Sequence, residues 1–344
     1  MRSSTPPSPQ RPARRAVLAG ASGFALLALA ACSGGDGQAA QQSPAASTST
    51  APATRTITTE QGAVEVPGDP QRIVVLSGSL AGYLFALDAP VVATDTRVLG
   101  VTDLEGGFPP AWSDEATAQG TTALPAGEEL NIEAVAAAGP DLIIGGGQGI
   151  TAVQAQEAYE ELSALAPTVL VPTTTTSWQE QLDLVAEATG RTDGVDALVD
   201  AYDAKVEEVR SSITVPDGDA VFILSLPVGK PYLVPADAAL PALAEEVGFT
   251  PDDVVTKAGN PTLYGSGDSF EVSPELLAQV ADAPTAFVVA LGGPSVEELA
   301  QDPVYAALPA FRNGQVHELP ATSYRPDYDG AMDALDAIAA EFGS

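Results

Sequence analysis

Short apolar runs alternate with stretches of helical periodicity along most of the chain. In the first half such runs occupy residues 72–76, 89–94, 141–145 and 168–172. After a long amphipathic stretch, further runs occupy residues 220–226, 285–291 and 315–319. This alternation is typical of parallel sheets covered by helices, and it occurs twice. The pattern therefore predicts an α/β fold with two separate sheets.

Capping residues mark several of the expected helices. Asn131 precedes the helical segment 132–138, and Ser273 precedes a helix that begins with Pro-Glu. Ser177 and Glu180 have the spacing of a capping box. Further helices are expected at residues 80–87, 238–247 and 329–342. NIEAVAAAGPDLIIG and SPELLAQVADAPTAFVVA share a cap, a helix and a following apolar strand, so each half carries one copy of a pseudo-repeat.

One long helix is expected between the two halves. Residues 193–213 place six apolar side chains on one continuous face: Val195, Leu198, Val199, Tyr202, Val206 and Val209. A helix of about 20 residues spans roughly 30 Å. We therefore predict an N-terminal lobe over residues 55–192, a connecting helix over 193–213 and a C-terminal lobe over 214–344.

The N-terminus has the pattern of an export signal. Four arginines and no acid precede an apolar stretch over residues 16–31, which is short for a membrane span but suits a signal peptide. The stretch ends in LAAC, which resembles a bacterial lipobox, so we expect a signal over 1–31 and lipidation at Cys32. The alternative is an ordinary signal with a chance cysteine, and both Sec and twin-arginine export stay open. Residues 32–54 lack the bulky apolar side chains that a packed core requires, so we expect them to form a flexible tether.

Composition excludes several classes of protein. Lys and Arg number 14 against 46 Asp and Glu, for a net charge of −32, so the overall field does not favour nucleic acid. A single Cys excludes an internal disulfide, and the single His, His317, excludes a clustered-histidine metal site. His317 lies in an expected strand, which favours a structural role.

Several segments resemble the class III substrate-binding proteins of ABC importers. These are PQRIVVL, NIEAVAAAGPDLIIG, the helix over 193–213 and DPVYAALPAFRNGQVHELP. Within that family, LSGSLAGYLFALDAPVVAT, SWQEQL and SYRPDYDGAMDALDAI look most like the ferric-enterobactin-binding branch. The resemblance implies two Rossmann-like lobes with mainly parallel sheets, joined by one long helix, and a ligand cleft between them. It also implies a monomer without enzymatic activity or cofactor.

The implied function is capture of a ferric siderophore outside the cytoplasm. The ligand would be of the catecholate, enterobactin-like class, with its iron held by the siderophore and no protein metal site. The protein would be lipid-anchored to the outer face of the cytoplasmic membrane and would deliver the ligand to a permease and its ATPase. Alternatives are a ferric hydroxamate binder, a haem or corrinoid binder, a sensory or adhesive module and, least favoured, an extracytoplasmic enzyme.

Candidate ligand-binding residues follow from charge and from the resemblance. Ferric tris-catecholates are trianionic, so an acidic protein must place its few cations at the site. The candidates are the cations Arg97, Arg325 and Lys230, the tyrosines Tyr232, Tyr264 and Tyr324, whose rings can stack on catecholates, and Ser77 and Ser79 at a helix N-terminus. Arg97 and Arg325 match branch arginines. Arg325 could instead pair with Asp327 or Asp329. Members of the branch carry extra basic residues in the loop that corresponds to YGSGDSF, and this loop has none.

Two glutamates are candidates for docking to the permease. In the family, one glutamate on each lobe pairs with permease arginines, and the matching positions are Glu133 and Glu275. Both lie at the same position of the pseudo-repeat, two residues after the capping residue. An acid in a first helical turn is also favoured by the helix dipole, so a purely structural role is the alternative.

Overall fold

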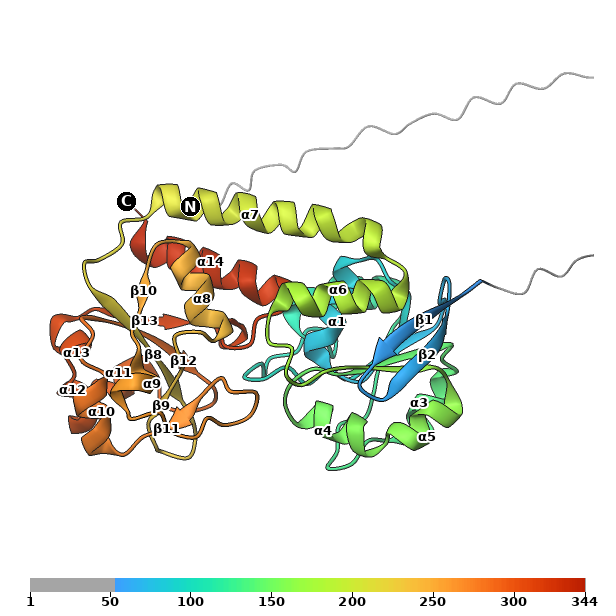
Figure 1. Cartoon of the computed structure of the whole chain (residues 1–344), viewed down its shortest axis with the longest axis horizontal. Coiled ribbons are helices and arrows are strands. Elements are labelled where there is room, and N and C mark those ends of the chain that lie inside the picture. The colour runs from blue at the N-terminus through green and yellow to red at the C-terminus, as the bar shows by residue number, and fades with distance from the viewer. Residues whose placement is uncertain (1–52, 344) are drawn as a thin grey trace, which may run out of the picture. The chain divides into compact units, whose positions relative to one another are not determined.

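The computed structural model describes residues 53–343 (Figure 1). The expected signal peptide, Cys32 and most of the expected tether lie outside the described residues. The tether was expected to run to residue 54, but Thr54 already begins the first strand. Within residues 53–343, none of the helices combines the length and the apolar character that a membrane crossing requires.

The N-terminal lobe is built on a five-stranded parallel sheet. Its strand order is β5-β4-β3-β6-β7, and every neighbouring pair is parallel. The strands are β3 (Ile73–Val75), β4 (Val91–Thr94), β5 (Thr122–Ala123), β6 (Leu142–Gly146) and β7 (Thr168–Val171). The helices are α1 (Gly78–Ala86), the 3₁₀ turn η1 (Pro110–Trp112), α2 (Ser113–Gln119), α3 (Ile132–Ala138), α4 (Ile150–Glu157), α5 (Tyr159–Leu165) and α6 (Trp178–Thr189).

The C-terminal lobe contains a six-stranded mixed sheet. The main order is β11-β9-β8-β12-β13, with β10 paired to β8. The β8–β12, β12–β13 and β8–β10 pairs are parallel, whereas β9 is antiparallel to both neighbours. The strands are β8 (Asp219–Ser225), β9 (Tyr232–Leu233), β10 (Thr250–Pro251), β11 (Phe270–Glu271), β12 (Thr285–Ala290) and β13 (Val316–Leu319). The helices are α8 (Ala239–Glu246), α9 (Val254–Lys257), α10 (Pro274–Val280), α11 (Val296–Leu299), α12 (Pro303–Ala306), α13 (Pro309–Asn313), the 3₁₀ turn η3 (Ala321–Ser323) and α14 (Tyr328–Phe342).

A long helix connects the two lobes. Helix α7 (Val195–Ser212) follows the 3₁₀ turn η2 (Thr192–Gly194) and packs against α14 and α6 (Figure 1). Trp178 of α6 makes edge contacts with Tyr202 of α7 and Tyr328 of α14, at centroid distances of 4.9 and 5.7 Å. This aromatic cluster joins three helices, one from the first lobe, one from the connection and one from the second lobe.

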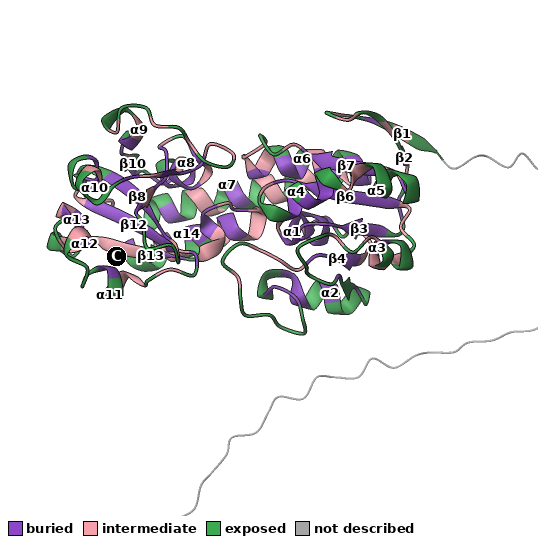
Figure 2. Ribbon diagram, turned by 90° about the horizontal axis from the view of Figure 1, so that it is seen from below, coloured by how far each residue is buried: buried purple, intermediate pink, exposed green. Residues whose placement is uncertain are grey.

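The largest buried apolar cluster is shared by both lobes. It includes Tyr83 of α1, Tyr202 of α7, Phe287 of β12 and Leu335 of α14. Figure 2 shows the strands of both sheets as mostly buried. Because this core is continuous, the two lobes are held to one another by packing as well as by the connecting helix. The α/β class with two mainly parallel sheets, predicted from the sequence, is confirmed.

An N-terminal hairpin was not anticipated. Strands β1 (Thr54–Thr59) and β2 (Gly62–Pro67) pair antiparallel, but each has only one fully buried residue, Ile57 and Val66. Such exposed strands carry a weak hydrophobic signal. Arg55 attaches the hairpin to the body by donating to the carbonyls of Pro67 and Ala188, at 3.1 and 3.2 Å, and to that of Glu187.

The predicted caps are present. Asn131 accepts from the Ala134 N–H at 2.9 Å, and Ser273 accepts from the Leu276 N–H at 3.2 Å. Ser177 accepts from the Glu180 N–H at 3.4 Å, which is the serine half of the predicted capping box. A complete box with both reciprocal bonds forms at Ser295, which precedes α11.

Candidate ligand-binding site

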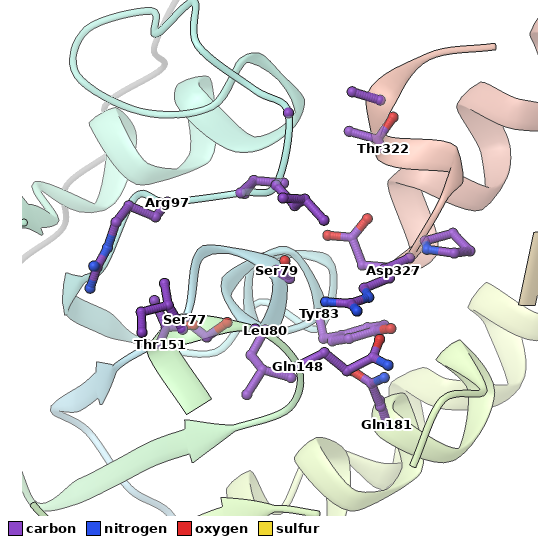
Figure 3. Close-up of a pocket in the computed structure, with 18 residues that line it drawn as sticks. Ser77, Ser79, Leu80, Tyr83, Arg97, Gln148, Thr151, Gln181, Thr322 and Asp327 are labelled. Carbon is purple, nitrogen blue, oxygen red and sulfur yellow. The ribbon is translucent and has the colours of Figure 1, made fainter. Parts of the chain in front are cut away.

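A cavity of about 280 Å³ lies where the two lobes face each other (Figure 3). The N-terminal lobe lines it with α1, the segment 97–100, the segment 148–151 and Gln181 of α6. The C-terminal lobe contributes five residues between β13 and α14, which are Ala321, Thr322, Arg325, Pro326 and Asp327. The N-lobe segments follow the carboxyl ends of β3, β4 and β6, which is where open α/β sheets bind ligands.

Ser77 and Ser79 lie at this cavity as expected. Ser77 is buried directly before α1, and its side chain makes no cap to the helix. A Cβ on Gly78 would lie 2.7 Å from the Arg97 carbonyl oxygen, so the glycine allows the 97–100 segment to cross close to the start of α1. The glycine-rich segment 145–149 also reaches the cavity, through Gln148 and Gly149.

Arg97 lines the cavity but is held by its own lobe. Its guanidinium donates to Asp95 from Nε at 3.0 and 3.1 Å and from Nη2 at 2.6 Å. It also donates to Gln154 at 2.7 Å and to the Gly127 carbonyl at 3.2 Å. The hydrogen bond to Asp95 raises the pKa of Arg97. Figure 3 shows the Arg97 side chain running away from Asp327.

Arg325 enters the same cavity from the C-terminal lobe. Its Nε and Nη2 donate to Asp268 at 2.5 and 3.1 Å, and its guanidinium carbon lies 5.1 Å from the Tyr324 ring centroid. Asp268, rather than the Asp327 or Asp329 considered from the sequence, is therefore its partner. Tyr324 is buried and lines a second, adjacent cavity together with Arg325.

The other expected contacts form a separate cluster on the C-terminal lobe. Lys230 pairs with Glu271 at 2.8 Å, and the Tyr232 hydroxyl donates to the same carboxylate at 3.2 Å. The Tyr232 and Tyr264 rings are 6.0 Å apart, and Tyr264 is half exposed. The structure thus brings Ser77, Ser79, Arg97 and Arg325 together at one cavity, and places Lys230, Tyr232 and Tyr264 outside its lining.

Carboxyl groups cluster where α14 meets α1. Asp327 caps α14 by accepting from the Gly330 N–H at 2.9 Å, and a Cβ on Gly82 of α1 would lie 2.5 Å from its Oδ2. Burial is the main cause that raises the pKa of Asp327 to about 6. Burial, and then the neighbouring Asp327 and Asp333, raise the pKa of Asp329 to about 7.

The two expected docking glutamates are exposed. Glu133 lies in the first turn of α3 and Glu275 in the first turn of α10. Each helix leads into an interior strand of its own sheet, β6 or β12, and both of these strands lie next to an edge strand. The pseudo-repeat is therefore a structural repeat, and it presents one acid from each lobe.

Several cavity residues were not identified from the sequence. Asp95 and Asp268 are the counterions of the two arginines, and Tyr83, Gln181 and Asp327 line the cavity. Asp95 could have been suspected from its spacing to Arg97, whereas Asp268 is 57 residues from Arg325. Over residues 53–343, no group of three or more His, Cys, Asp or Glu side chains could hold a metal ion.

The fold and the cleft define a two-lobed α/β binding protein, and comparisons with known proteins place it in a family. The periplasmic binding protein family matches residues 73–322. The chain is 30% identical to the ferric enterobactin-binding periplasmic protein FepB of Escherichia coli O6:H1, over 84% of this chain and 91% of that protein. It is 26% identical to the probable siderophore-binding lipoprotein YfiY of Bacillus subtilis, over 75% of each chain.

A solved structure shares the fold. The crystal structure of holo-ViuP superposes with a TM-score of 0.71 at 24% identity, covering 84% of this chain and 95% of that chain. The chain belongs to the periplasmic binding protein family, which confirms the resemblance to class III substrate-binding proteins indicated by its motifs.

We predict that Asp329→Asn flattens the pH dependence of stability. The folded-state pKa of Asp329, about 7, lies above its ordinary value, so its contribution favours folding at low pH and is lost as pH rises to about 7. Urea unfolding should show the variant gaining on the wild type between pH 5 and pH 8, by on the order of 1 kcal/mol after solvent screening.

The matched control is Asp196→Asn, which changes an exposed acid in the first turn of α7. It removes a carboxylate from a first helical turn, as Asp329→Asn does, so the loss of the helix-dipole interaction is common to both variants and burial is what distinguishes them. If the stability of wild type and Asp329→Asn depended on pH in the same way, the raised pKa of Asp329 would be contradicted.

Proposed function

We propose that the protein captures a ferric siderophore of the catecholate class in the cleft between its lobes. The observation that carries the proposal is the convergence of Arg97, Arg325, Ser77 and Ser79 on one cavity in a strongly acidic chain. Electrostatic attraction is local at physiological ionic strength, so an anion must be met by nearby cations. The similarity to FepB over most of both chains supports the ferric enterobactin-like class.

We further propose delivery to an ABC permease and its ATPase by a lipid-anchored monomer on the outer face of the cytoplasmic membrane. The exposed positions of Glu133 and Glu275 support docking through both lobes. The LAAC segment and the lipoprotein YfiY among the relatives support the anchor. In this role the protein binds and releases its ligand without chemical conversion.

We expect Arg97→Ala and Arg325→Ala each to weaken binding of a triply negative ferric catecholate by roughly 10–100-fold, the effect of losing one charge-assisted contact. Quenching of the two tryptophans measures the affinity, with a panel of ferric catecholates and hydroxamates as ligands. Arg312→Ala, which removes an exposed cation of α13, is the control and should bind normally. Wild-type affinity in both cleft variants, with folding verified by thermal unfolding, would remove these arginines from the site.

We expect the double variant Glu133→Ala/Glu275→Ala to bind ligand normally while uptake into cells falls steeply. Reversal of both residues to Arg should reduce uptake further, because like charges would then face the permease arginines. Glu160→Arg, at an exposed acid in the first turn of α5, controls for the change of charge. Normal uptake by the double reversal variant would exclude docking through these residues.

We expect Cys32→Ala to release the protein from the membrane. Fractionation of cells that process the signal normally should move the variant from the membrane fraction to the soluble fraction, because a lipid attached to Cys32 would be lost. A processed variant that stays with the membranes would show that attachment does not depend on Cys32.

A further inference from the structure

The guanidinium of Arg325 stands between two cavities. The first is the cavity of about 280 Å³ described above, and the second, of about 120 Å³, is lined by Asp268, Tyr324 and Gln148 among others. Arg325 borders both cavities, whereas Asp268 borders only the second. The ion pair therefore forms part of the wall that separates the two spaces. The first cavity alone is small for a bulky ligand, since ligand pockets are usually about 300–1,000 Å³.

Asp268 occupies the edge of the Arg325 guanidinium that is best suited to bind an anion. Nε and Nη2 form a parallel donor pair, and both donate to Asp268. The remaining Nη1 lies 3.9 Å from where a Cβ on Gly149 would stand, on the side of the first cavity. The Arg325 side chain is 20% exposed and that of Asp268 is 7% exposed. An anion that enters the first cavity can thus reach Arg325, but it meets a carboxylate already bound there.

The two arginine pairs of the cleft differ in how firmly they are held. Asp95 also accepts from the Arg97 backbone N–H at 2.8 Å, and the Arg97 guanidinium has additional partners in Gln154 and Gly127. These bonds lie within one lobe and tie Arg97 to its loop. Arg325 and Asp268 come instead from two segments that are far apart in the sequence, the stretch before α14 and the turn closed by the Tyr264–Ser269 bridge. Because the Arg325 guanidinium donates to Asp268, whereas that of Arg97 donates to Asp95, Gln154 and Gly127, a ligand that takes the place of the aspartate breaks fewer hydrogen bonds at Arg325.

Resting on the proposed function, we propose that Asp268 is a resident counterion of Arg325 that sets the charge of the ligand preferred by the cleft. An anionic ferric complex must displace the carboxylate from the guanidinium, or share the guanidinium with it. An uncharged complex of similar size has no such competition. Asp268 therefore lowers the affinity for anions selectively, and it keeps Arg325 paired while the cleft is empty.

The test compares two ferric complexes of different charge by tryptophan quenching at low salt. Ferric enterobactin is triply negative, and ferrichrome is an uncharged hydroxamate complex. In Asp268→Asn we expect affinity for the anionic complex to rise about tenfold relative to the uncharged one, and the gain to shrink at high salt. Asp268→Glu retains the charge and should keep the wild-type ratio. Asp282→Asn removes an acid that pairs with Lys257 outside the lining of both cavities, and it should also keep that ratio.

The outcomes separate this proposal from the proposed function. If the wild type binds neither complex, nor any other in the ferric panel, the proposed function fails. If the wild type binds but the affinity ratio of Asp268→Asn is unchanged, Asp268 does not set charge preference. If Asp268→Asn loses affinity for both complexes equally while folding normally, Asp268 only positions Arg325, and the proposal is overturned.

Discussion

The candidate site depends on two arginine–aspartate pairs that hold guanidinium groups at the cleft of a very acidic chain. Asp95 fixes the Arg97 guanidinium together with Gln154 and the Gly127 carbonyl, and Asp268 holds the guanidinium of Arg325. Both aspartates are almost fully buried, so the pairs are only weakly screened by solvent. The same carboxylates that position the arginines also neutralise them. The cleft therefore presents guanidinium donors whose positions are fixed and whose charges are already paired with carboxylates.

The apolar core shared by both lobes keeps the two sides of the cavity in a fixed arrangement. Trp178, Tyr202 and Tyr328 pack helices from both lobes against the connecting helix. Gly82 leaves room for the Asp327 carboxylate, since a Cβ there would lie 2.5 Å from its Oδ2, and so allows the start of α14 to approach α1 closely beside the cavity. A rotation of one lobe against the other would disturb these contacts. The arrangement thus favours a cleft that is largely formed before a ligand enters.

Much of the fold could be predicted because buried strands and capped helices leave strong local signals. The 132–138 helix and its Asn131 cap were predicted as they are observed. The β1–β2 hairpin was missed because its strands are mostly exposed. The site was harder to predict, since a cation's partner depends on tertiary structure: Arg325 binds Asp268, 57 residues away, rather than the nearby Asp327. Lys230 and Tyr232 followed a C-lobe strand as expected, yet they turn towards Glu271.

The attachment of the hairpin by Arg55 has a mechanical consequence. Thr54 pairs with Pro67 at the open end of the β1–β2 ladder, so a pull on the chain before Thr54 would peel the strands apart one pair at a time. Arg55 lies one residue inside that end and bonds to carbonyls of β2 and of the last turn of α6. The force would thus pass into α6 before it could open the ladder. A load on the chain before Thr54 would therefore be shared between the β1–β2 ladder and α6 of the first lobe.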